Sequence, residues 1–145
     1  MSLFSSYDII LESKYSTENV LIILERKMEL ERDDSYLIER SKATQSKFDN
    51  FALLECWVEE KENKTLITIG FRTNPMLLIT YIFTFIFALI GILEAITQYD
   101  VFGLIFVIPL AIEYPMSRII FAFNKRNKML EIERLLHASF YGYDK

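Results

Sequence analysis

An unbroken run of 18 residues without a charge, Met76 to Leu93, constrains this chain more than any other feature of its sequence. At about 1.5 Å of helical rise per residue, the run covers roughly 27 Å of a hydrocarbon core that is about 30 Å thick. A second apolar run extends from Val101 to Phe123 and is interrupted only by Glu113 and Arg118. The residues between the runs, EAITQYD, are suited to a tight connection. We therefore predict two transmembrane helices that form a hairpin.

The distribution of cations predicts the orientation of this hairpin. Arg72 precedes the first run, whereas the connection between the runs contains Glu94 and Asp100 but neither lysine nor arginine. Because lysine and arginine are enriched in the loops that stay in the cytoplasm, both termini are expected on the cytoplasmic side. Four further cations end or follow the second run: Arg118, Lys125, Arg126 and Lys128.

A carboxylate near the middle of the second run is the main candidate for a functional site. At the centre of a spanning helix Glu113 costs about 2.5–3.5 kcal/mol on insertion scales, so it is expected to face protein or water. Antiparallel pairing of the spans puts Glu113 at about the depth of Thr84, with Thr80 and Tyr81 one turn away, and these hydroxyls are its expected partners. Arg118 is a further partner for the carboxylate. A structural or oligomer-contact role and a ligand, ion or proton role both remain open.

Small residues continue one side of the first run. Ala88, Gly91 and Ala95 follow Thr80 and Thr84 along much the same side of the predicted helix. Such residues permit close approach of two helices in a membrane. We expect this face to contact the second span or a second copy of the chain.

The N-terminal part reads as alternating strand and helix patterns. Tyr7–Ser13 is apolar and β-branched, as in a strand, and Ser16 or Thr17 is a suitable cap for a helix that extends to about Leu30. The sequence ERDDS is expected to break the pattern, and YLIER to form a short strand at best.

Two longer strand-like runs follow, FALLECWVEE and TLITIGFR, separated by the polar sequence KENK. They predict an antiparallel β-hairpin. The fold class is therefore expected to be α+β, with a cytoplasmic domain at residues 1–75 that is joined to the transmembrane hairpin at 76–123. The spans are placed at about 76–96 and 101–123.

The C-terminal tail, residues 124–145, is predicted to continue the second span as a cytoplasmic helix. Its apolar residues lie on one side of that helix and favour packing on the domain. The alternative is a helix that lies on an anionic bilayer surface. These apolar residues are Met129, Ile132, Leu135 and Leu136.

Several kinds of function are not expected. Residues 1–75 contain 10 lysines and arginines against 14 acidic residues, so this part repels phosphate backbones and argues against a nucleic-acid partner. A lone His137 and a lone Cys56 do not suggest a catalytic pair, and no metal-ligand spacing or phosphate-binding glycine loop is visible. We therefore expect no enzyme activity, no metal and no cofactor.

The overall layout resembles that of small bacterial membrane proteins with a cytoplasmic strand–helix–strands module, an R-x-x-P junction, two spans and a charged helical tail. The segments FRTNPMLLITYIFTF and FNKRNKMLEIERLL carry the resemblance, which implies the bacterial inner membrane as the location but no activity.

The sequence thus leads to two functional hypotheses. The first is a non-enzymatic inner-membrane protein of immunity, regulatory or accessory-subunit type. It would act through a protein or ligand, with membrane lipid and either a homo-oligomer or another membrane protein as partners. The alternative is a subunit of an oligomeric ion or proton channel or transporter that uses the carboxylate of Glu113.

Overall fold

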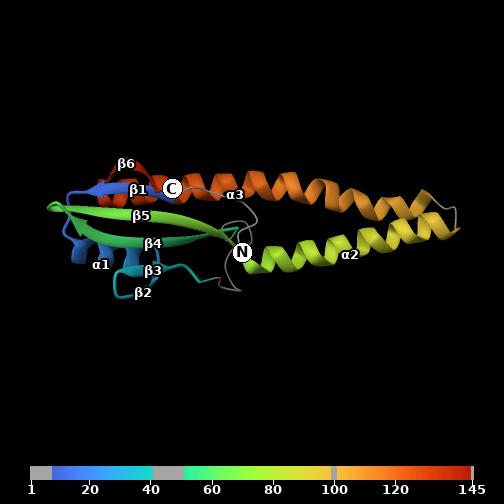
Figure 1. Cartoon of the computed structure of the whole chain (residues 1–145), viewed down its shortest axis with the longest axis horizontal. Helices are drawn as coiled ribbons and strands as arrows, with labels where there is room; N and C mark the ends of the chain where they lie inside the picture. The colour runs from blue at the N-terminus through green and yellow to red at the C-terminus, as the bar shows by residue number, and fades with distance from the viewer. Residues whose placement is uncertain (1–7, 41–50, 99–100, 145) are drawn as a thin grey trace.

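The structure, a computed structural model, describes residues 8–40, 51–98 and 101–144, and a sheet at one end adjoins a long helical hairpin (Figure 1). The six strands pair antiparallel in the order β2-β3-β4-β5-β1-β6, which confirms the predicted α+β class with an antiparallel sheet. The strands are β1 (Asp8–Ser13), β2 (Glu31–Asp33), β3 (Tyr36–Ile38), β4 (Ala52–Lys61), β5 (Lys64–Thr73) and β6 (Ser139–Asp144). The helices are α1 (Thr17–Lys27), α2 (Pro75–Gln98), the 3-10 helix η1 (Val101–Phe106) and α3 (Val107–Leu136).

Tight turns set the register of the two β-hairpins. Glu62 and Asn63, between β4 and β5, have φ angles of 53° and 61°, the left-handed pair that matches the twist of the flanking strands. The predicted pairing of these two strands is confirmed. Asp34, with a φ of 56°, occupies the corresponding turn between β2 and β3. The expectation that ERDDS only breaks the pattern was wrong, because its first three residues form β2 against β3.

The hydrophobic core lies between one face of the sheet and two helices. Alternate strand residues point to this face, and α1 begins where the Ser16 hydroxyl accepts a hydrogen bond from the backbone N–H of Asn19. The C-terminal half of α3 covers the rest of the face, which confirms the prediction that the tail helix packs on the domain. The fully buried core side chains include Leu11, Val20, Leu24, Leu37, Leu54, Ile67, Ile69, Ile132 and Leu136.

One helix links the two ends of the molecule. α3 runs without interruption from the tip of the helical hairpin, through Pro115, to the core of the sheet (Figure 1). The predicted division between residues 123 and 124 therefore falls inside a continuous helix. At its end His137 adopts a left-handed conformation, φ 45°, and the chain reverses into β6. Strand β6 was not predicted, and it pairs with β1 at the edge of the sheet.

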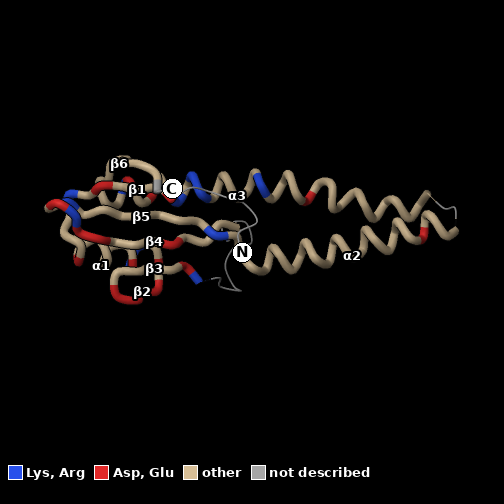
Figure 2. Tube along the Cα trace, in the orientation of Figure 1, with Lys and Arg blue, Asp and Glu red and all other residues tan. Residues whose placement is uncertain are grey.

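We call residues 75–123 the helical hairpin, and the six strands with α1 and residues 124–136 the sheet module. Both helices of the hairpin are long and apolar enough to cross a membrane, with mean hydropathies of 2.6 and 1.7 over their most apolar windows. α2 continues to Gln98, so most of the predicted connection is helical, while Tyr99 and Asp100 lie outside the described residues. Charged residues gather on the sheet module and are sparse on the hairpin (Figure 2).

Candidate functional site

The two helices of the hairpin touch through a pair of glycines near its tip. A Cβ atom built on Gly91 would lie 2.2 Å from the carbonyl oxygen of Gly103, and one built on Gly103 would lie 2.4 Å from the carbonyl oxygen of Gly91. Any side chain at either position would therefore push the backbones apart. Ala88 is only 2% exposed, and Ala95 is half-buried beside Gly103. The contact face of α2 thus runs over these residues and meets η1, whose Gly103 the sequence analysis had not selected.

This crossing fixes the register of the two helices. The Tyr81 hydroxyl donates a hydrogen bond of 3.2 Å to the backbone carbonyl oxygen of Glu113. Glu113 therefore lies level with Tyr81, three residues from the predicted level at Thr84. The contact of Gly91 with Gly103 gives the same register, because Gly91 lies ten residues after Tyr81 on α2 and Gly103 lies ten residues before Glu113.

The predicted hydroxyl partners of Glu113 form hydrogen bonds within their own helix instead. The Thr80 hydroxyl donates to the Met76 carbonyl at 3.0 Å, and the Thr84 hydroxyl donates to the Thr80 carbonyl at 3.0 Å. This bond to the carbonyl four residues back is a common alternative for threonine in a helix. Arg118 is exposed. Within the described part of the chain, no hydrogen bond or ion pair involves the half-buried carboxylate of Glu113.

A small polar cluster nevertheless lies at the level of Glu113. Ser117, one turn after Glu113, is 4% exposed, and its side chain lies close to the Tyr81 hydroxyl. The ring of Tyr114 lies 6.4 Å from that of Tyr81. The sequence signal for Ser117 was its spacing of four residues from Glu113, which places both on one helix face. Hydroxyl groups and one carboxylate thus lie at one level of a hairpin that is mostly apolar.

The junction of hairpin and sheet is held by two buried asparagines. The side-chain oxygen of Asn74 caps α2 by accepting from the Met76 N–H at 3.0 Å, and the backbone N–H of Asn74 donates to the Phe51 carbonyl at 3.2 Å. The Phe51 N–H in turn donates to the Asn124 side-chain oxygen at 3.2 Å. Asn74 and Asn124 are 7% and 5% exposed. One backbone residue before β4 therefore connects the start of α2 with the middle of α3.

A partly buried ion pair strengthens the same junction. The Lys128 ammonium lies 2.5 Å from a Glu39 carboxylate oxygen and donates to the Ala52 carbonyl at 2.7 Å. The same Glu39 oxygen accepts from the Leu54 N–H at 3.0 Å. Both charged side chains are about one-seventh exposed, at 14% and 16%. Lys128, one of the cations used to predict orientation, therefore points into the protein and ties α3 to β4.

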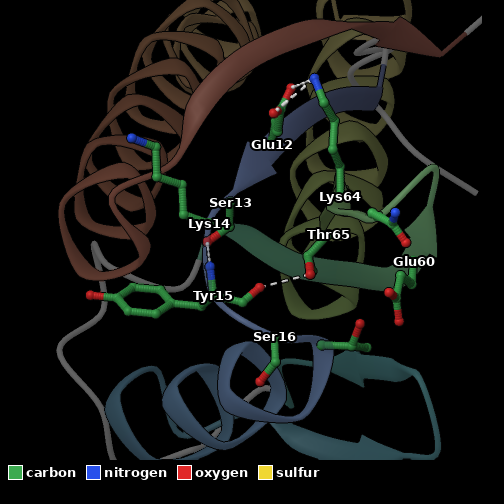
Figure 3. A pocket seen from close by; sticks show the side chains of 10 residues that line it. Glu12, Ser13, Lys14, Tyr15, Ser16, Glu60, Lys64 and Thr65 are labelled. Atoms are coloured by element: carbon green, nitrogen blue, oxygen red, sulfur yellow. Dashed lines mark hydrogen bonds and ion pairs between the residues drawn. The ribbon is translucent and has the colours of Figure 1, made fainter.

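A polar pocket of about 460 Å³ lies at the end of the sheet far from the hairpin (Figure 3). Its walls contact one another: the Thr65 hydroxyl donates to the Tyr15 carbonyl at 2.7 Å, and Lys64 forms an ion pair with Glu12 at 3.1 Å. Its charged lining residues balance, because Lys14 and Lys64 are matched by Glu12 and Glu60. The pocket therefore has no excess of one charge with which to attract an ionic ligand.

The residues most suited to nucleophilic chemistry are not arranged for it. Cys56 is fully buried in the core, and this burial raises the pKa of its thiol, which disfavours the reactive thiolate. The exposed His137 ends α3 with its ring 6.0 Å from that of Tyr15. Among residues 8–40, 51–98 and 101–144, no group of three or more histidine, cysteine or acidic side chains has a geometry that could hold a metal ion.

Comparisons with protein-family models, with curated proteins and with solved structures found no match for this chain. The fold and the site therefore define the protein only by class: an α+β protein that carries a helical hairpin apolar enough to span a membrane.

Proposed function

We propose that this chain is an integral protein of the bacterial inner membrane that acts by binding another membrane protein or a ligand, not by catalysis. The helical hairpin inserts into the bilayer, and the sheet module and both termini lie in the cytoplasm. The observation that carries the proposal is the junction, where Phe51 bridges Asn74 and Asn124 and where Lys128 pairs with Glu39. Because α3 also belongs to both parts, a partner bound at one end acts on the other through a rigid connection.

The exposed surface of the hairpin supports membrane insertion. Only 17% and 11% of the most apolar windows of its two helices are buried, whereas the core helix of a soluble protein is mostly buried. Large side chains such as Phe83, Leu93 and Ile119 are 59%, 61% and 65% exposed. Contiguous apolar surface of this kind is stable in contact with lipid or with another protein.

Binding at the hairpin is the expected mode of action. The polar cluster at Tyr81, Glu113 and Ser117 interrupts the apolar surface, and a half-buried carboxylate in such surroundings gains by meeting a donor from outside the chain. An immunity protein, a regulator or an accessory subunit would use the cluster to recognise the helix of a partner or a second copy. The sheet module would then stabilise the position of that contact.

The decisive experiment compares the wild type with Glu113→Gln. Reporter tags on the two termini test the orientation, and the mass of the native complex in mild detergent gives the stoichiometry. The contact role predicts that both tags are cytoplasmic and that Glu113→Gln changes the composition of the complex. Tags on opposite sides of the membrane, or a chain that stays soluble without lipid, would contradict the proposal.

A second candidate function is favoured by the absence of an internal partner for the carboxylate within the described residues. In an oligomer, several copies of Glu113 would line a path for ions or protons. This function predicts that Glu113→Gln abolishes flux into proteoliposomes while the oligomer remains assembled. Loss of assembly with unchanged flux per complex excludes it.

A further inference from the structure

A shallow groove lies where α3 leaves the helical hairpin and passes the edge of the sheet. It has a volume of about 370 Å³, and its lining is mainly apolar. One wall is the outer side of α3 and the other is the aromatic strand β6. The residues that matter here are Ala122, Lys125, Arg126 and Leu130 of α3, and Phe140 and Tyr143 of β6.

The groove continues the outer surface of the hairpin. Ile119 and Phe123, which precede it on α3, are 65% and 61% exposed, and Leu130 within it is 54% exposed. Their spacings of four and seven residues keep them on one side of the same helix. If the hairpin is inserted as proposed above, a lipid that contacts Ile119 and Phe123 has a direct path to the groove.

The charges of the groove are arranged for an anion at its hairpin end. Lys125 and Arg126 are the first cations after the apolar part of α3, apart from Arg118. The Lys125 ammonium lies 5.7 Å from the centre of the Phe71 ring, and the Asp8 carboxylate offsets part of its charge, whereas Arg126 is exposed. The acidic residue of the lining, Glu133, lies two turns further from the hairpin, so a phosphate is favoured next to the two cations.

The aromatic wall suits the interface between lipid and water. Phe140 and Tyr143 are 56% and 64% exposed, and their rings meet edge to face with centres 5.1 Å apart. Tyrosine is enriched at membrane interfaces because its ring is apolar and its hydroxyl is polar. Strand β6 is also a sheet edge, which a second copy of the chain would use for pairing. Such pairing would not explain the two cations, and these favour lipid.

We propose that this groove binds one anionic phospholipid of the surrounding bilayer. The phosphate lies between Lys125 and Arg126, the acyl chains run along Phe123 and Ile119, and β6 covers the glycerol region. This inference rests on the proposed membrane insertion. The bound lipid would contact both α3 and β6 and so hold the sheet module at the membrane surface.

The test measures retention of phosphatidylglycerol and of phosphatidylcholine by the full chain in detergent, using native mass spectrometry. A juxtamembrane cation contributes about 1 kcal/mol to anionic lipid binding. Lys125→Gln and Arg126→Gln should therefore each weaken phosphatidylglycerol binding about five-fold, and the double variant about thirty-fold. The pair Lys125→Arg and Arg126→Lys should retain binding. Arg134→Gln is the matched control, since Arg134 is an exposed cation of the same helix outside the groove.

Three outcomes would overturn the inference: equal retention of both lipids by the wild type, unchanged retention in the double variant, or an equal loss in Arg134→Gln. A dimer through β6 that replaces bound lipid would overturn it as well. Failure of the proposed function looks different, because the wild type would then remain soluble without detergent and would not enter lipid nanodiscs.

Discussion

The sheet module and the helical hairpin differ in where they place their apolar side chains. In the sheet module, residues such as Leu24 and Ile67 are fully buried between the sheet and two helices. In the hairpin, most of the large apolar side chains point outward, and the contact between helices is made by small residues such as Ala88 and Gly91. The sheet module therefore covers most of its large apolar side chains itself, whereas the hairpin leaves an apolar surface that lipid or another protein can cover.

α3 shows this contrast within one helix. Ile119 is 65% exposed in the hairpin, whereas Ile132, little more than three turns later, is fully buried in the module. Between them Asn124 and Lys128 make the polar contacts of the junction. The same residue type thus has a different energetic role depending on which side of the junction it occupies. The predictions below test that difference.

The largest effect is expected for Ile132→Ala. Removing this fully buried side chain leaves a cavity between α3 and the sheet, which should lower the free energy of unfolding by about 3–4 kcal/mol. The control is Leu130→Ala, which shortens a 54% exposed side chain on the same helix and should change stability by less than about 0.5 kcal/mol. Denaturation in detergent can be followed by fluorescence of Trp57, the chain's one tryptophan, which lies in β4. Equal losses in both variants would show that this part of α3 is not packed on the sheet.

A somewhat smaller loss is expected when the junction ion pair is broken. The Glu39 side chain is 16% exposed, and Lys128→Met removes the cation that pairs with its carboxylate. The free energy of unfolding should therefore fall by about 2–3 kcal/mol. Adding Glu39→Gln should recover part of this loss, because the remaining partner is then neutral. Lys27→Met, on the exposed end of α1, is the control. Additive effects of the two junction changes would mean that the pair does not interact in solution.

How far the sequence predicted this arrangement depends on whether the signal was local. The uncharged run from Met76 to Leu93 and the polar turn before β5 are visible within a few residues, and both the apolar helix and the β-hairpin they indicated are present. Strand β6 was missed because Phe140 and its neighbours follow a helical pattern directly, and only the left-handed conformation of His137 ends that helix.

The candidate site was harder to predict, because it depends on which residues meet across the hairpin. The level of Glu113 follows from the contact of Gly91 with Gly103, and two glycines far apart in the sequence do not reveal that they touch. Lys128 has the same local appearance as the neighbouring Lys125 and Arg126, yet it alone pairs with Glu39, a residue 89 positions away. Long-range pairing of this kind is not encoded in local periodicity.

Gly91→Ala tests the close contact between the helices of the hairpin and should have a smaller effect than the two changes in the sheet module and at the junction. The added methyl would lie 2.2 Å from the Gly103 carbonyl, so the helices must separate, at a cost of about 1–2 kcal/mol. Gly142→Ala is the matched control, since a Cβ there meets no atom within 4 Å. Resistance to unfolding by a denaturing detergent measures the effect. A Gly91→Ala protein as stable as the control would show that the two helices do not touch at their glycines in the membrane.

The smallest effect is expected at the surface of the sheet module, where Arg32 donates hydrogen bonds of 3.0 Å to both carboxylate oxygens of Glu18. These bonds lower the pKa of the Glu18 carboxyl below its ordinary 4.5. A carboxyl group whose pKa is lower in the folded state stabilises the fold above its unfolded pKa, and that contribution disappears as the pH falls through the folded value. Glu18→Gln should therefore reduce Tm at neutral pH and not at all in strong acid. The reduction should be slight, because the Glu18 side chain is 63% exposed to solvent. The measurement is Tm against pH for the wild type and Glu18→Gln, with Arg32→Gln as the complementary variant.

A Tm difference between wild type and Glu18→Gln that grows on acidification would refute this account, because the stabilising species must be the ionised carboxylate.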